Sequence, residues 1–391
     1  MEFDLTETQR LFKRSAGELF ATECPPQVVR EMIESGNPYS ETLWNKLVEQ
    51  GWTGLTFSED AGGLGLSHVE LAVAFEEMGR ALVPGEFLST VALAGPLIER
   101  AGTPEHHAKY LQAIIEGRSR ATVALLEDAA GWSIDAINLQ ATETADAVEL
   151  RGRKLFVTDA EVADFIVTPA RAGSQLLLAV VDRNSEGLKI NPMPSIDATR
   201  NLSELLFDNV KVARADLLAT GDEARRALEH ALDVATLALA AEMVGGMQWT
   251  LDAAVEYAKT RKQFGKPIGQ FQAIQHHCAN MLLMTESARS AVYYAAWVMG
   301  NNEAESPLAV SIAKMYASDA CREVGNLGIQ VHGGIGFTWD EPVHFYYKRA
   351  KASEIMFGDA THHRERIAKL IVDRASEPDK SGGQWSAVGG Q

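Results

Sequence analysis

The spacing of hydrophobic residues changes twice along the chain. Between residues 6 and 117 the apolar side chains recur at helical intervals, as in segment 67–78 (SHVELAVAFEEM). Between residues 119 and 220 they form short alternating or continuous runs, such as 176–181 (LLLAVV), which are typical of strands. From residue 223 to about residue 375 the helical spacing returns in long segments. The pattern predicts helices, then a sheet, then helices.

These changes divide the chain into three predicted domains and a tail. A chain of 391 residues exceeds the size at which a single core usually keeps growing. We predict an α+β multidomain fold with an N-terminal α-helical domain (1–118), a central β-barrel or sheet domain (119–222) and a C-terminal four-helix bundle (223–375). Residues 376–391 are rich in Gly and Ser and predict a disordered tail.

Composition and charge restrict the class of protein. The 53 acidic and 36 basic residues give a net charge of -17, which repels phosphate backbones and argues against nucleic-acid binding. Three cysteines without CxxC spacing indicate a reducing compartment. The acidic start does not resemble a signal peptide, and no run of eighteen apolar residues occurs. We therefore predict a soluble, cytoplasmic protein that does not cross a membrane.

Several familiar ligand motifs are missing. No GxGxxG follows a predicted strand and no GxxxxGK[ST] occurs, which argues against a nicotinamide Rossmann site and against a P-loop. The pairs His276–His277 and His362–His363 have neither HExxH spacing nor a neighbouring Cys or Asp cluster. We predict that the chain holds no metal ion.

Two segments carry unusual chemistry. Residues 260–272 end a long helix with Arg261, Phe264 and a glycine turn, and a permanently charged guanidinium at this place suits a diphosphate. The alternative is an ordinary helix end with Gly265 in the left-handed conformation. Residues 330–336 (QVHGGIG) hold three glycines whose N–H groups can approach a ligand closely, or they form only a tight link between helices.

Together the two segments are far more specific. The pattern RxxFGxxIxxFQ followed by QxxGGxG resembles the C-terminal domain of the FAD-dependent acyl-CoA dehydrogenases. The resemblance covers roughly residues 3–372 and is supported by three further segments: 51–55 (GWTGL), 61–67 (AGGLGLS) and 204–212 (ELLFDNVKV).

The resemblance implies FAD as cofactor and assigns residues to it. Leu126, Phe156, Val157 and Thr158 fall where the family packs the flavin ring, with Thr158 near the flavin N5. Arg261, Gln263 and Phe264 fall on the diphosphate-binding turn, with Phe271 and Gln272 beside it. Gln330, Gly333 and Gly334 fall on a stretch that contacts FAD from a neighbouring subunit. We predict that FAD lies between two chains, with Arg261 on one and Gln330–Gly334 on the other.

The resemblance also implies oxidation of an acyl-CoA thioester at Cα–Cβ, with electrons passed to an electron-transfer flavoprotein. This chemistry needs a carboxylate base in a water-poor pocket. Phe357 and Ala235 occupy the two positions where the family carries its Glu. Trp132 stands where a small Ser lines the thioester path, and Thr236 stands where an Arg is common. We predict that Trp132, Ser133, Phe357 and Gly358 face the substrate.

Three hypotheses follow from the missing Glu. In the first, which we adopt for the site assignment, Asp359 is the catalytic base through a shifted loop, although it could equally cap the last helix. In the second, the chain binds FAD and a paralogous subunit supplies the base, as in heterotetrameric dehydrogenases of sterol side-chain breakdown. In the third, it is an oxidase, a monooxygenase or an inactive binding protein on the same fold.

The oligomeric state differs between these hypotheses, from a homodimer or tetramer to a heterotetramer with a paralogue. Three other carboxylates are candidate bases, although each fits a solvated helix face or an ion pair better: Glu242, Glu354 and Glu365.

Overall fold

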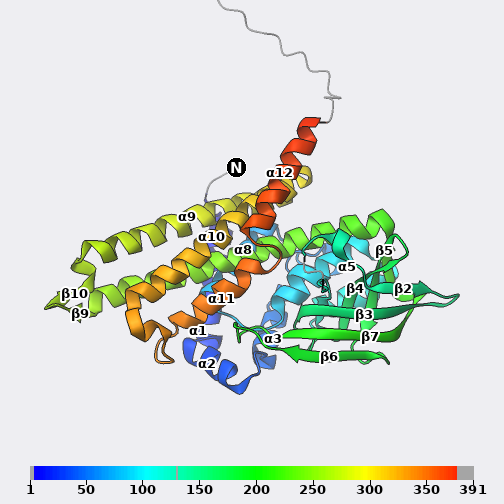
Figure 1. Ribbon diagram of the computed structural model, residues 1–391, viewed down its shortest axis with the longest axis horizontal. Helices are drawn as coiled ribbons and strands as arrows, with labels where there is room; N and C mark the ends of the chain where they lie inside the picture. Colours follow the sequence, from blue (N-terminus) through cyan, green and yellow to red (C-terminus); the bar gives the residue numbers. More distant parts are fainter. Residues whose placement is uncertain (1–3, 129–130, 377–391) are drawn as a thin grey trace, which may run out of the picture.

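The computed structural model describes residues 4–128 and 131–376, and its three parts follow the predicted order (Figure 1). Helices form the N-terminal part, strands the central part and long helices the C-terminal part. The predicted disordered tail lies, apart from Ser376, outside the described residues. In the part of the chain that the structure describes, no helix combines the length and the apolar character needed to cross a membrane.

The N-terminal helices begin at side-chain caps that the sequence supplies. The Thr6 and Ser67 hydroxyls accept hydrogen bonds from N–H groups in the first turns of α1 and α4. The side chains of Gln9 and Glu70 accept in turn from the N–H groups of Thr6 and Ser67, so both helices start with a capping box. The helices of this part are α1 (Glu7–Glu23), α2 (Pro26–Ser35), α3 (Glu41–Glu49), α4 (His68–Arg80), α5 (Gly95–Ala101), α6 (Pro104–His106) and α7 (Gln112–Ile115).

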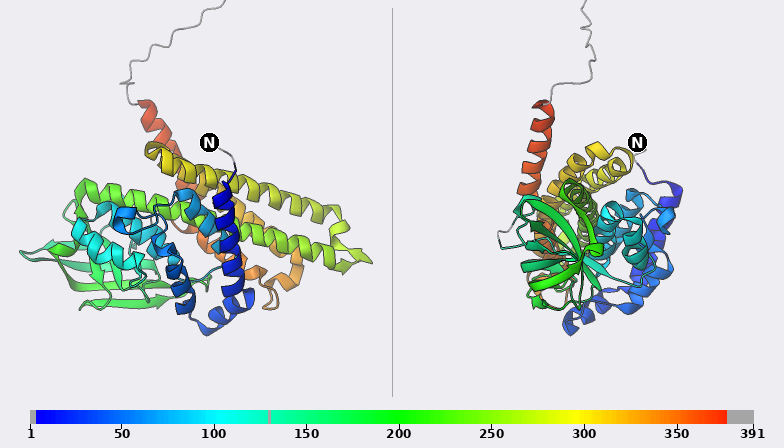
Figure 2. Two further views of the ribbon diagram at one scale, coloured as in Figure 1. Left: turned by 180° about the vertical axis from the view of Figure 1, so that it is seen from behind. Right: turned by 90° about the vertical axis from the view of Figure 1, so that its right-hand side faces the viewer.

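The central part is an eight-stranded sheet with the order β6-β7-β3-β2-β4-β5-β8, and β1 pairs with β4. Most neighbours are antiparallel, whereas β1 and β2 run parallel to β4. The strands are β1 (Ala121–Val123), β2 (Gln140–Glu143), β3 (Ala147–Thr158), β4 (Phe165–Ala172), β5 (Gln175–Asp182), β6 (Leu188–Met193), β7 (Leu202–Ala213) and β8 (Leu217–Thr220). The end-on view in Figure 2 shows the sheet and the N-terminal helices on different sides of the molecule.

The described C-terminal part contains five helices, not the four predicted. The chain breaks between the last two because Phe357 and Gly358 both have positive φ (56° and 99°), which no helix tolerates. The elements are α8 (Gly221–Thr260), β9 (Lys262–Gln263), β10 (Lys266–Pro267), α9 (Gln272–Asn301), α10 (Ser306–His332), α11 (Val343–Ile355) and α12 (Ala360–Ser376).

Helix α8 extends from the sheet to the far end of the molecule, where β9 and β10 form a short hairpin (Figure 1). It crosses α4 at two glycines. A Cβ on Gly79 would lie 1.9 Å from the Glu242 carbonyl oxygen, and one on Gly245 would lie 1.8 Å from that of Glu76. The two backbones therefore touch, and only glycine fits at the crossing.

A buried ionic network joins the three parts of the fold. Arg349 of α11 donates from Nε to Asp197 Oδ2 of the β6–β7 loop (2.8 Å) and from NH1 to Glu242 Oε1 of α8 (2.6 Å). Arg200 also contacts Glu242. All four side chains are buried, so each charge depends on its partners for the solvation that water would otherwise supply.

Candidate functional site

A cavity of about 600 Å³ lies between the β-domain loop 132–135, the first turns of α8 and the start of α12. Three of the residues predicted to face a substrate, Trp132, Ser133 and Phe357, line it. The fourth, Gly358, is buried in the turn before α12 and is not part of the wall. The rings of Trp132 and Phe357 meet edge to face, with centroids 5.5 Å apart and an interplanar angle of 69°.

The acidic residues that line the cavity are paired or stand at its solvent-exposed rim. Asp233 binds Arg366 of α12 through both carboxylate oxygens, with 2.9 Å between Oδ2 and NH2. The other acidic lining residues are Asp135 and Glu229, which pair with Arg225, Glu303, which pairs with Arg100, and the exposed Glu365. Among the described lining residues, none offers an unpaired, sheltered carboxylate.

The end of β3 presents a half-exposed aromatic ring. The strand bulges between Lys154 and Val157, and Phe156 adopts a φ of 54° with 49% of its surface exposed. The neighbouring N–H of Leu155 donates to the Leu126 carbonyl (2.8 Å), which brings the predicted Leu126 beside this strand end. Thr158 is buried at the end of the strand, whereas the Val157 side chain belongs to the core of the sheet domain.

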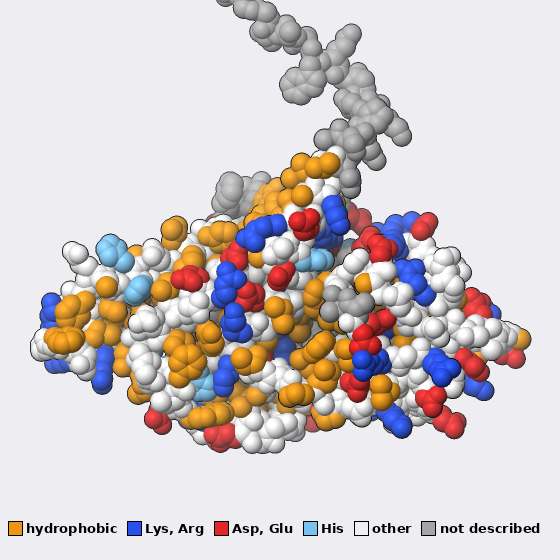
Figure 3. All heavy atoms as spheres, in the orientation of Figure 1, with side chains coloured by type: hydrophobic (Ala, Val, Ile, Leu, Met, Phe, Trp, Pro, Cys, Tyr) orange, Lys and Arg blue, Asp and Glu red, His pale blue; other side chains and the backbone are white. Residues whose placement is uncertain are grey.

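The hairpin of β9 and β10, beyond the last residue of α8, presents a second exposed ring. Phe264 is 91% exposed at a φ of 52°, edge to face with Phe271 (6.1 Å). Arg261, Gln263 and Gln272 are exposed around it. Figure 3 shows hydrophobic side chains gathered at this end. An aromatic ring held in open solvent by a strained backbone is the kind of feature that a ligand or a partner chain covers.

The glycine segment lies at the same end as the hairpin. His332 precedes Gly333, and its ring stacks on that of Tyr257 near the end of α8, with centroids 4.6 Å apart. No atom lies within 4 Å of a Cβ built on Gly333 or Gly334, and Gln330 is exposed. Our expectation that Arg261 and Gln330–Gly334 contact FAD from different chains is therefore not supported, because one chain carries both segments side by side.

Sequence comparison decides the family. The acyl-CoA dehydrogenase C-terminal domain matches residues 225–372, and the N-terminal domain matches residues 6–118. The chain is 30% identical over 380 residues to the caffeyl-CoA reductase–Etf complex subunit CarC of Acetobacterium woodii, covering 94% of this chain and 99% of that one. The chain belongs to the acyl-CoA dehydrogenase family.

Solved structures of acyl-CoA dehydrogenases share the whole fold. Butyryl-CoA dehydrogenase from Megasphaera elsdenii superimposes with a TM-score of 0.88 at 27% identity, over 95% of this chain and 100% of that one. The ChsE4–ChsE5 complex from Mycobacterium tuberculosis gives a TM-score of 0.87 at 27% identity, over 97% and 100%. The predicted arrangement of a helical, a sheet and a second helical domain is confirmed.

Membership of the acyl-CoA dehydrogenase family makes the chain an oxidoreductase of the class that acts on CH–CH groups, and it confirms FAD as the cofactor. The structure suits this cofactor. Exposed aromatic rings at Phe156 and Phe264 offer surfaces for flat rings, and the unobstructed Gly333 and Gly334 leave room for a ligand against the backbone.

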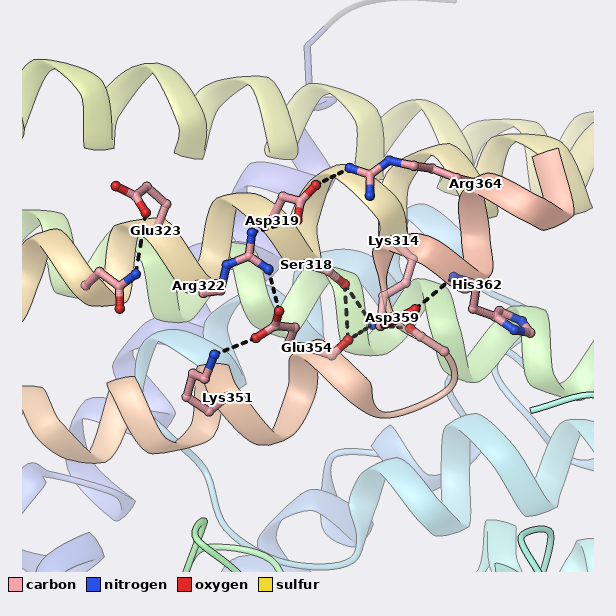
Figure 4. A network of polar contacts seen from close by, with 12 residues as sticks. Lys314, Ser318, Asp319, Arg322, Glu323, Lys351, Glu354, Asp359, His362 and Arg364 are labelled. Atoms are coloured by element: carbon pink, nitrogen blue, oxygen red, sulfur yellow. Dashed lines mark hydrogen bonds and ion pairs between the residues drawn. The ribbon is translucent and has the colours of Figure 1, made fainter. Parts of the chain in front are cut away.

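Asp359, the base that we assigned, takes the position of a helix cap. Its Oδ1 accepts a hydrogen bond from the His362 N–H (2.8 Å) in the first turn of α12. Figure 4 shows this contact between Asp359 and His362, and Asp359 is exposed and absent from the wall of the cavity. This geometry favours the capping alternative. A catalytic role for Asp359 remains a prediction without structural support.

The other candidate bases lie in ion pairs or at the rim. Glu242 belongs to the buried network around Arg349. Glu354 pairs with Arg322 of α10 and with Lys351 of α11 (2.9 Å), as Figure 4 shows. Glu365 is exposed at the mouth of the cavity. Ala235, at the second family position of the Glu, is fully buried in α8.

Sequence reasoning overlooked two buried lysines. Lys154 is fully buried near the end of β3 that we predict to face the flavin, and its Nζ donates to Glu127 Oε1 (2.6 Å). Burial lowers the pKa of Lys154 to about 8. Lys314 of α10 is also fully buried, and its contacts are described below. A lysine within the apolar run KLFV signalled the first of these, whereas nothing local distinguishes Lys314 from a surface lysine.

His363, considered above only as a possible metal ligand, lines the cavity and is 99% buried. Its Nε2 lies 3.1 Å from the Phe357 carbonyl, which can only accept, so Nε2 carries the proton. Its Nδ1 has no partner among the described residues. Burial, reinforced by the nearby Lys314, lowers the pKa of His363 to about 3, so the ring is neutral.

Proposed function

We propose that this chain is the FAD-binding subunit of an acyl-CoA dehydrogenase that oxidises a thioester at Cα–Cβ and draws its catalytic base from a paralogous partner subunit. One observation carries the proposal. On the described wall of the cavity every sheltered carboxylate is already paired, and Phe357 occupies the place where the family has its Glu.

The chemistry explains why this matters. FAD, when bound, accepts the hydride that leaves the β-carbon, and a base must take the proton from the α-carbon. A phenyl ring cannot accept a proton, and Asp233 is engaged by both nitrogens of Arg366. A positioned base contributes about 10²- to 10⁴-fold to such a step. The cavity of this chain therefore lacks a component that thioester oxidation requires.

The placement of the predicted FAD residues supports an assembly. In one chain, the sheet that contains β3 and the hairpin of β9 and β10 lie on opposite sides of the molecule (Figure 1). One FAD can contact both sets only when two chains meet, the sheet domain of one facing the hairpin and glycine segment of the other. This division replaces the one that we first expected.

Two relatives make a mixed assembly the stronger choice. The ChsE4–ChsE5 structure is a complex of two differently named chains, and CarC is named as a subunit of a reductase–Etf complex. By analogy, we propose a paralogue as the partner and an electron-transfer flavoprotein as the electron acceptor. This part of the proposal rests on likeness and not on geometry.

Anaerobic mixing tests the proposal. The FAD-loaded chain is purified alone and after co-expression with a paralogous dehydrogenase gene, and each sample is mixed with short, branched, aromatic and steroid acyl-CoAs. We expect flavin absorbance to bleach only in the co-expressed sample. Bleaching of the chain alone, abolished by Asp359→Asn, would restore the Asp359 hypothesis. Rapid reoxidation in air with release of peroxide would favour an oxidase.

A further inference from the structure

The aromatic contact inside the cavity joins two domains. Trp132 comes from a loop of the sheet domain and Phe357 from the turn between α11 and α12, and Phe357 is only 8% exposed. Edge-to-face rings with centroids 5.5 Å apart are in van der Waals contact. An acyl chain could pass between them only if the rings separated by about the thickness of a carbon chain, roughly 3.5–4 Å.

The backbone of Phe357 is held in an unfavourable conformation. Its φ of 56° lies in the left-handed region, which residues with a large side chain seldom adopt. Such a conformation persists only where surrounding contacts impose it. The position of the Phe357 ring is therefore a product of its neighbours and not of the local sequence.

Lys314 imposes this conformation from beneath the turn. Its buried ammonium uses all three donors, to the Gly358 carbonyl (2.9 Å), the Glu354 carbonyl (3.1 Å) and Ser318 Oγ (2.9 Å). Figure 4 shows Lys314 reaching from α10 to the loop that leads into α12. The Phe357 carbonyl is bound in turn by His363 Nε2. Contacts thus hold the chain on both sides of the break.

We infer that Trp132 and Phe357 form an aromatic plug, locked by Lys314, that excludes acyl thioesters from the flavin face of this chain. Trp132 and Phe357 are specificity-determining residues, and Lys314 is a positioning residue. The inference rests on the proposed function, because Phe357 stands where the family presents its base to the thioester. In the mixed assembly, the partner's cavity then takes the substrate, and one thioester binds for every two chains.

Butyryl-CoA is the probe for this plug. It is titrated into the FAD-loaded chain alone, and binding is followed by calorimetry and by the shift of the flavin spectrum. We expect no spectral shift for the parent. For the Trp132→Ser/Phe357→Ala variant we expect the Kd for butyryl-CoA to fall by about tenfold or more. Ile196→Ala, which trims an exposed side chain remote from the cavity, serves as control and should behave as the parent.

Lys314→Met tests the lock without touching either ring. We expect it to retain FAD and to gain part of the affinity of the double variant, because the turn is released. If Lys314→Met does not fold, Phe357→Gly replaces it, since glycine adopts a positive φ without strain and removes the ring. Equal affinity of the parent and of the ring variants for butyryl-CoA would overturn the inference.

The outcomes separate this inference from the proposed function. If the parent alone binds butyryl-CoA with a spectral shift but without bleaching, the plug is wrong and the missing base stands. If the double variant gains affinity as expected but no paralogue restores flavin reduction, the plug stands and the partner subunit is wrong. Bleaching of the parent alone overturns both.

Discussion

The two ends of α8 differ in how their side chains are satisfied. At the hairpin end, Phe264 is 91% exposed, Arg261 has no acidic partner among the described residues, and the glycine segment is unobstructed. At the cavity end, Asp233 is bound to Arg366, and the ring of Phe357 rests on Trp132. The first end leaves its groups open to a ligand, whereas the second supplies its own partners.

We interpret this difference as the result of keeping the predicted FAD-binding residues at the hairpin while the residues around the cavity have changed. Groups that bind a cofactor are left exposed or strained in the protein without its cofactor, because their binding partner is not part of the chain. Groups that need no ligand have partners within the chain, as Asp233 has in Arg366 of α12. The hairpin end therefore has the features of an open binding site, whereas the charged and aromatic groups around the cavity are paired with one another.

Reinstalling the base should produce the largest effect. We expect Phe357→Glu combined with Trp132→Ser to let the chain alone reduce its flavin with an acyl-CoA, at a rate about 10²-fold or more above the parent, as a positioned base provides. Anaerobic stopped-flow absorbance measures the rate. The control is Phe357→Gln with Trp132→Ser, which opens the site without a base. Equal rates for both variants would show that the cavity lacks more than a carboxylate.

Breaking the ion pair of the cavity should destabilise the fold. Arg366→Leu leaves the buried Asp233 unpaired, and we expect a loss of about 2–3 kcal/mol, since the guanidinium is itself partly exposed. Denaturant unfolding measures the loss. The matched control is Glu143→Gln, which breaks an exposed pair with Arg214 and should cost about 0–1 kcal/mol. A loss no greater than that of the control would mean that the cavity end is open to water.

Replacing Arg261, which directly precedes the hairpin, should weaken FAD binding while leaving the fold intact. Arg261→Ala is expected to lower the affinity for FAD about tenfold, because a charge-assisted contact with the diphosphate disappears. Lys262→Ala, at the next exposed residue of the hairpin, is the control. Flavin content after gel filtration distinguishes the two. Full retention of flavin by the Arg261 variant would remove this residue from the site.

Acid should act on the cavity through His363. Its pKa is about 3 in the folded protein and about 6.5 when unfolded, so the unfolded chain binds the proton more readily between these values. Stability from the neutral ring is fully present above pH 6.5 and is lost as the pH falls towards 3. Between pH 7 and 5.5 we expect a loss of about 1 kcal/mol that His363→Gln lacks. Unfolding curves at both pH values give the comparison, and parallel curves would contradict it.

Much of the fold was predictable because it rests on local signals. The change from helical to strand spacing gives the order of the parts, and caps such as Thr6 and Ser67 mark helix starts. The turn after α8 was also predictable, since Arg261, Phe264 and Gly265 lie within one short segment, and its contact with FAD stays a prediction. The loop before the last helix was expected at Asp359, but the number of C-terminal helices was not predicted correctly.

The polar contacts in and beside the cavity could not be predicted, because the two residues of each contact are far apart in the chain. Asp233 meets Arg366 across 133 positions, and Lys314 reaches the carbonyl of Gly358 across 44. Spacing along one helix says nothing about a partner on another. The sequence left Asp359 open between a base and a helix cap, and the structure has the cap, whose partner His362 is only three residues away.

Helix α8 sets the distance between the cavity and the β9–β10 hairpin. It contains 40 residues, and a helix of that length spans about 60 Å. Its first turns line the cavity of one chain, and its last residue precedes the turn that we assign to the flavin of a partner. One inserted residue would advance everything beyond it by about 1.5 Å and rotate it by about 100°. An insertion within α8 would therefore move the hairpin relative to the cavity, whereas an insertion in an exposed loop would leave their spacing unchanged.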